Sequence, residues 1–183
     1  MTLRDTNKKF GSLSKTLHWV VAFSMIGMFC LGYWMRGLDY YNAWYLKAPH
    51  IHESIGLLLC IVIIFFLFWR LNNENPDDSD LKPLERLGGK IMKISLYIMM
   101  FSIFITGYLI SSAGDNSIDV FNWFTVPASL DINQNKVLVG QLHQYFAYFI
   151  MTLTLVHLGA ALKHHFVDNN DILKRIIPFV KIT

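Results

Sequence analysis

The apolar positions of the chain gather in four long runs that are separated by polar links. The runs lie at about 17–35, 50–70, 90–111 and 140–162. A helix needs about 20 predominantly apolar residues to cross the hydrocarbon core of a bilayer, and each run is close to that length. Lipid offers no hydrogen-bond partner to irregular backbone, so the pattern predicts four transmembrane α-helices.

Composition agrees with this class. The chain has 183 residues, of which 54% are hydrophobic and 16% charged. We therefore expect one polytopic membrane domain over residues 1–183 rather than a soluble protein. Cys30 and Cys60 both fall inside apolar runs, and their spacing suggests neither a disulfide nor a zinc site.

The basic residues predict the orientation. Thirteen Lys and Arg flank the N-terminus, the second link and the tail, whereas the other two loops hold three. Because cytoplasmic loops carry the excess of positive charge, both termini are expected in the cytoplasm. We expect residues 71–89 to form a loop and the segment after Leu162 to be a polar tail. The outward segment VFNWFTVP is expected to lie flat at the lipid surface, with Trp123 and Phe124 as anchors.

Two histidines lie in the last apolar run. His143 and His157 are fourteen residues apart, which in a helix is a rise of roughly 21 Å and a rotation about 40° short of four full turns. Both imidazoles are therefore expected on one helix face at two depths. Histidines inside a membrane usually face a bundle interior and have a partner there.

The predicted topology supplies those partners. His18 begins the first span near the inner surface, and His52 begins the second near the outer surface. By the same reasoning His143 lies near the outer surface and His157 near the inner one. The depth-matched pairs are His18 with His157 and His52 with His143. Two such pairs in a four-helix bundle suit two b-type haems, each iron held by two neutral imidazoles.

Other residues have simpler interpretations. His50 is two residues from His52 and points to another helix face, so we interpret it as a boundary residue. His164 and His165 are expected to be solvated at the inner edge, with service to haem propionates or proton exchange with a quinone as the alternative. Arg36 and Arg70 are candidates for holding haem propionates, because an interfacial carboxylate favours a cationic partner; further candidates are Lys47, Lys90 and Lys93. A single membrane histidine more often forms an interhelical hydrogen bond than a metal bond. A metal-ion transporter is disfavoured because the spans lack additional carboxylates.

Several motifs together carry a resemblance to a known family. The chain has LHW at Leu17–Trp19, IHESIG at Ile51–Gly56, QLH at Gln141–His143, VH at Val156–His157, and the closing ALKHHFVDNNDILKRI. In combination these resemble the prokaryotic cytochrome b561 family, the group that includes bacterial superoxide oxidase. The closing motif has Asn170 where a lysine is common. The resemblance implies axial haem ligands at the same four positions, which are His18, His52, His143 and His157.

The expected protein is thus an all-α four-helix bundle in the bacterial inner membrane, with two haems b. The resemblance implies an oxidoreductase that transfers electrons between a donor, with superoxide among the candidates, and the ubiquinone pool. The alternative is a non-catalytic anchor or relay subunit for a partner oxidoreductase. Expected partners are membrane lipid, a quinone and a periplasmic redox partner, and no nucleic acid is expected.

Overall fold

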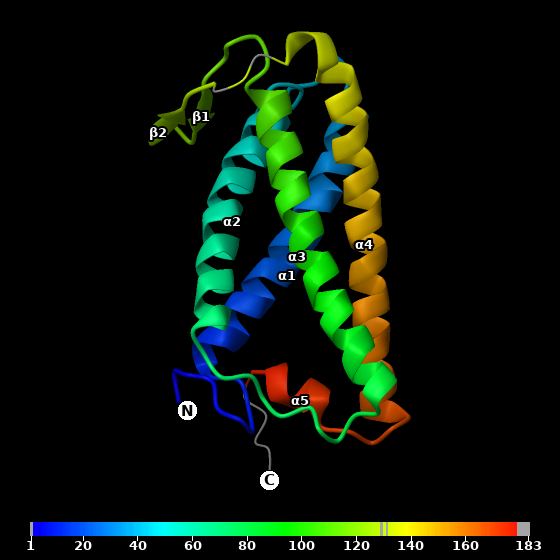
Figure 1. Cartoon of the computed structure of the whole chain (residues 1–183). Coiled ribbons are helices and arrows are strands. Elements are labelled where there is room, and N and C mark those ends of the chain that lie inside the picture. The colour runs from blue at the N-terminus through cyan, green and yellow to red at the C-terminus, as the bar shows by residue number, and fades with distance from the viewer. Residues whose placement is uncertain (1, 129, 131, 179–183) are drawn as a thin grey trace. The chain divides into compact units, whose positions relative to one another are not determined.

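Four long helices carry the four apolar runs in the computed structural model, which describes residues 2–128, 130 and 132–178 (Figure 1). They are α1 (Ser12–Met35), α2 (Lys47–Leu71), α3 (Pro83–Ser111) and α4 (Lys136–Phe166). Each is long and apolar enough to cross a membrane. The four predicted spans are therefore confirmed as apolar helices, and each begins earlier than predicted. Two residues that enter the charge counts lie outside the described residues, namely Asp131 and Lys181.

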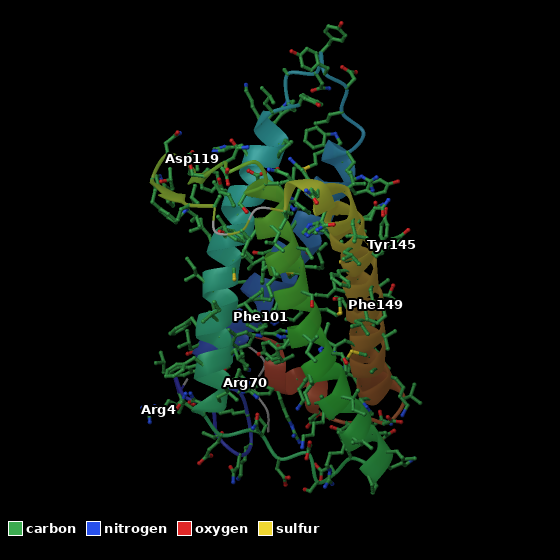
Figure 2. All side chains as sticks on the ribbon, turned by 45° about the horizontal axis from the view of Figure 1, so that its top comes forward. Arg4, Arg70, Phe101, Asp119, Tyr145 and Phe149 are labelled. Carbon is green, nitrogen blue, oxygen red and sulfur yellow. The ribbon has the colours of Figure 1, made fainter. Side chains whose placement is uncertain are left out.

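The large apolar side chains of these helices are mostly exposed. At most 22% of the most apolar window of any of the four helices is buried. In Figure 2, Tyr145 and Phe149 point away from the other helices, and they are 66% and 52% exposed. Leaving so much apolar surface in water would cost about 25 cal/mol for each Å². The exposed surface is therefore suited to lipid, and the chain is a multi-pass membrane protein.

The contacts of the chain form two compact units. One comprises Met1–Ala22, Val62–Leu96 and Thr152–Thr183, and the other comprises Phe23–Ile61 and Tyr97–Met151. We call them the first and second unit. The first unit contains the starts of α1 and α3 and the ends of α2 and α4, whereas the second contains the opposite ends. The expectation of a single domain over residues 1–183 stays a prediction.

The first unit contains two helical segments that the sequence did not predict. Helix α3 starts at Pro83, inside the segment expected to be a loop, and proline suits a first helical turn because its missing N–H needs no partner there. The C-terminal tail contains a short helix, α5 (Ile172–Ile176), beside the start of α1 (Figure 1). Hydrogen bonds from α1 hold its end: Lys15 Nζ donates to the Ile177 carbonyl at 3.0 Å and Trp19 Nε1 to the Ile176 carbonyl at 3.1 Å.

The second unit contains a β-hairpin where a flat interfacial segment was expected. Strands β1 (Ile118–Val120) and β2 (Phe124–Val126) pair antiparallel. Phe121 and Asn122 in the turn have φ angles of 50° and 58°, which matches the twist of a tight hairpin. Trp123 is 72% exposed and Phe124 44% exposed. Their role as lipid anchors stays a prediction.

Candidate metal centres

His52 and His143 come together in the second unit. Their ring centres are 6.3 Å apart and their planes are inclined at 77°. His52 lies one turn into α2, and His143 lies two turns into α4. Both rings are half-buried. Residues 91 positions apart in the sequence thus lie opposite one another. Their depth in the membrane and their role as haem ligands stay predictions.

The separation of these rings fits one metal ion between two imidazoles. Two metal–nitrogen bonds of about 2 Å, with about 1 Å from each nitrogen to its ring centre, separate the ring centres by about 6 Å. The Nδ1 atom of His52 is buried and has no hydrogen-bond partner among the described residues. Among the described residues no hydrogen bond competes for this nitrogen, so it does not restrain the ring from binding a metal.

Two glycines allow the rings to lie close to neighbouring helices. A Cβ atom built on Gly32 of α1 would lie 3.1 Å from Cε1 of His52. A Cβ built on Gly107 of α3 would lie 3.1 Å from Cε1 of His143. Both separations are tighter than ordinary van der Waals contact. Each imidazole thus packs against helix backbone at a position where only glycine leaves enough space.

The His143 ring is also hydrogen-bonded to α3. Its Nδ1 lies 3.1 Å from the Ile103 carbonyl oxygen and 3.0 Å from Thr106 Oγ1. The sequence analysis did not identify Thr106, Gly107 or the Ile103 carbonyl. The adjacent Thr and Gly in an otherwise apolar run were the available signal.

His18 and His157 belong to the first unit. Both are half-buried, and His18 lies within electrostatic range of His157 and of Arg70. The His18 ring also makes an edge contact with Trp19, with ring centres 5.5 Å apart. Each depth-matched pair therefore falls within one unit of the fold, so the two candidate centres are separate.

Arg70 is engaged in a local network, which was not foreseen. Its Nη1 donates to Asp5 Oδ2 at 2.7 Å, it hydrogen-bonds Asn75, and its guanidinium lies 4.7 Å from the centre of the Phe10 ring. The Asp5 side chain is fully buried and also accepts from Ser14 Oγ and the Gly11 amide. Arg70 thus links the N-terminal segment to α2. Arg36 is exposed at the end of α1. Propionate binding by either arginine stays a prediction.

His50 joins the hairpin rather than the His52–His143 pair. Its Nε2 lies 3.0 Å from Asp119 Oδ2, which also accepts from the Asn122 amide at 3.0 Å. Hydrogen bonding to His50 holds the pKa of Asp119 below its usual range. Ser54 Oγ donates to the Asp119 carbonyl and accepts from the Phe121 amide, both at 3.3 Å. The hairpin is thereby attached to α2 on either side of His52.

The expectation that both His164 and His165 are solvated is wrong for His164. Its side chain is 14% exposed, and its Nδ1 lies 2.8 Å from Asp168 Oδ2. Lys163 lies 2.8 Å from the same carboxylate and 2.7 Å from Glu85, and the hydrogen bond from Lys163 lowers the pKa of Asp168. Because Lys163 forms an ion pair with each carboxylate and His164 bonds one of them, we interpret this cluster as a surface ion-pair network rather than a metal site.

Comparisons with known proteins now decide the family. The model of a family described as prokaryotic cytochrome b561 matches residues 9–179. The chain belongs to the prokaryotic cytochrome b561 family. It is 40% identical over 179 residues to Cytochrome b561 homolog 2 of Escherichia coli K12, covering 97% of this chain and 95% of that protein. It is 22% identical over 175 residues to Cytochrome b561 homolog 1 of the same organism, covering 93% and 97%.

Membership of this family relates the four apolar helices and the histidines to one function. A cytochrome b561 is a membrane protein that binds b-type haem and transports electrons, and bis-histidine ligation suits that haem. The resemblance read from the LHW, IHESIG and QLH motifs is confirmed.

Proposed function

We propose that this protein is a di-haem cytochrome that transfers electrons across the bacterial inner membrane between a donor and the ubiquinone pool. His52 and His143 would hold one haem b in the second unit, and His18 and His157 would hold the other in the first. The observation that carries the proposal is the 6.3 Å separation of the His52 and His143 rings, which suits one iron. A b-type haem supplies reversible one-electron reduction of its iron when bound.

The two histidine pairs give the proposed electron transfer a direction across the membrane. The two histidine pairs belong to different units, and each long helix contributes to both units. If the basic segments are cytoplasmic, with both termini inside, then the His52–His143 centre lies toward the outside. An electron accepted at one pair can thus leave at the opposite membrane face.

A relay subunit for a partner oxidoreductase is the second candidate function. The loop between α1 and α2 supports it, because it exposes several large hydrophobic side chains at the end of the helices. Tyr40, Tyr41 and Leu46 are 78%, 94% and 78% exposed. Asx-type hydrogen bonds from the amides of Tyr41 and Trp44 to Asp39 and Asn42 hold the loop in shape. Such a surface suits either a partner protein or the lipid boundary.

The test uses the purified full-length protein in detergent and in proteoliposomes. Pyridine haemochrome analysis should give two haems b per chain, and the difference spectrum should show low-spin cytochrome b. Addition of ubiquinol or of superoxide should then reduce haem without another protein. A chain with no haem would contradict the proposal. Full haem content with no reduction by quinol or superoxide, restored by a membrane extract, would favour the relay function.

A further inference from the structure

The two imidazoles of the His52–His143 pair have different surroundings. Nδ1 of His143 faces two oxygens of α3, the Ile103 carbonyl at 3.1 Å and Thr106 Oγ1 at 3.0 Å. Nδ1 of His52 is buried and has no partner in the described part of the chain. A metal bound between them would therefore have two chemically unequal histidine ligands.

The carbonyl of Ile103 determines the tautomer of His143. A carbonyl oxygen can only accept a hydrogen bond, so the proton must reside on Nδ1 of the imidazole. The lone pair is then on Nε2, which is the form that can bind a metal. If the proton were on Nε2 instead, both Nδ1 and the carbonyl would present lone pairs to one another at 3.1 Å.

Thr106 adds a second acceptor for the same proton. Its Oγ1 lies 2.8 Å from the Ser102 carbonyl and 3.1 Å from the Ile103 carbonyl, and it donates its single proton to them. The lone pairs of Oγ1 are then left for Nδ1–H of His143. Thr106 is 8% exposed, and a β-branched side chain is stiff at χ1. The hydroxyl is thus held in position by its own helix.

The imidazole rings of His52 and His143 are otherwise packed in similar ways. Gly32 meets His52 and Gly107 meets His143, and a Cβ atom on either glycine would lie 3.1 Å from the ring Cε1. Both rings are close to a neighbouring helix and half-buried. The difference between the two ligands therefore lies in hydrogen bonding rather than in packing.

We propose that Thr106 and the Ile103 carbonyl are positioning groups that make His143 the more electron-donating ligand of this haem iron and leave His52 the weaker one. The inference rests on the proposed haem site. An Nδ1–H that donates a hydrogen bond makes the imidazole more basic, and such outer partners typically change metal affinity or activity by about 10-fold to 100-fold. A more basic ligand also stabilises the oxidised iron and lowers the midpoint potential.

The first test compares Thr106→Val and Thr106→Ser with Ser102→Ala as the matched control. Ser102 is one turn away on α3, and its Oγ bonds the Ile98 carbonyl of its own helix. In Thr106→Val, transfer of one haem to apomyoglobin should be about 10-fold faster, and one of the two midpoint potentials should rise. Thr106→Ser should restore both values, and Ser102→Ala should match the wild type.

The outcomes separate this inference from the proposed function. A wild type without haem would overturn both. A wild type with two haems, together with a Thr106→Val variant whose haem transfer and potentials equal those of Ser102→Ala, would overturn the inference alone.

A second measurement does not depend on the Thr106 variants. His143→Gly and His52→Gly are each reconstituted with haem in the presence of imidazole or of 1-methylimidazole, which cannot donate a hydrogen bond when it binds the metal. At position 143, imidazole should restore the low-spin spectrum at a concentration about 10-fold lower than 1-methylimidazole. At position 52 the two compounds should act alike. An equal preference at both positions would overturn the inference.

Discussion

Replacing Gly107 by alanine should damage the His52–His143 site more than replacing Gly32. The new Cβ would lie 3.1 Å from Cε1 and 3.6 Å from Nδ1 of His143, so the ring or the helix must shift by a few tenths of an ångström. The His143 ring is held on α3 by the Ile103 carbonyl and Thr106 and cannot move away without losing these bonds. The His52 ring has no such bond among the described residues and can move.

The magnitude follows from two opposing effects. Overpacking of this kind costs about 2 kcal/mol, and alanine in place of glycine in a helix returns about 1 kcal/mol. The net loss of about 1 kcal/mol in Gly107→Ala is a loss of folding stability. The overpacking falls on the haem ligand itself, so its cost of about 2 kcal/mol corresponds to roughly 30-fold weaker haem retention at this site. In Gly32→Ala the ring can yield, so the two effects should nearly cancel.

Haem retention is measured by transfer to apomyoglobin, with Gly88→Ala as the control. Gly88 is also on α3, and a Cβ atom built on it meets nothing within 4 Å. The control should keep haem as well as the wild type does and be slightly more stable. If Gly107→Ala behaved like Gly88→Ala, the packing of His143 against α3 would be refuted.

Three further predictions concern other parts of the molecule. Asp5→Ala leaves Arg70 without its buried partner, so the free energy of unfolding, measured by thermal denaturation, should fall by about 3 kcal/mol. Asp78→Ala, which removes an exposed carboxylate from Arg86, should change this free energy little. The folded pKa of Asp119 is lowered, so its contribution to stability is present above the usual pKa of about 4 and is lost as pH falls through the folded pKa. The melting temperature of Asp119→Asn should therefore fall less on acidification than that of the wild type. An equal fall of the two melting temperatures with pH would contradict the contact with His50. If the segments after α1 and α3 face outward as the basic flanks predict, that side holds three cations, Arg36, Lys47 and Lys136, against five carboxylates. Haem reduction by superoxide should then be slower than diffusion control, and a rate at that ceiling which falls steeply with salt would exclude this expectation.

The pairing of His52 with His143 could be predicted from the sequence because depth in a membrane follows from topology alone. Run length and the basic flanks give each helix a direction, and direction sorts four histidines into two levels. Thr106 and Gly107 could not be found this way. The third span contains no histidine, and only the rotation of α3 about its axis decides which of its residues face the His143 ring.

Tertiary contacts explain the remaining differences from the sequence predictions. The hairpin turn at Phe121 and Asn122 needs positive φ at two non-glycine residues, and Ser54, far away in the sequence, bonds the Phe121 amide. Helix α5 is too short to be stable alone and is bonded to Lys15 and Trp19 of α1. Such contacts join segments 67 to 162 residues apart and leave no local pattern.

The central claim is that the four histidines hold two separate haems as His18 with His157 and His52 with His143. The most direct measurement is the haem content and difference spectrum of the four single His→Ala variants, with His50→Ala as the control. Each variant should lose one haem, with His18 and His157 giving one residual spectrum and His52 and His143 giving the other, and His50→Ala should keep both haems. Loss of the same haem from His18→Ala and His52→Ala, or loss of a haem from His50→Ala with both retained in His52→Ala, would contradict the account.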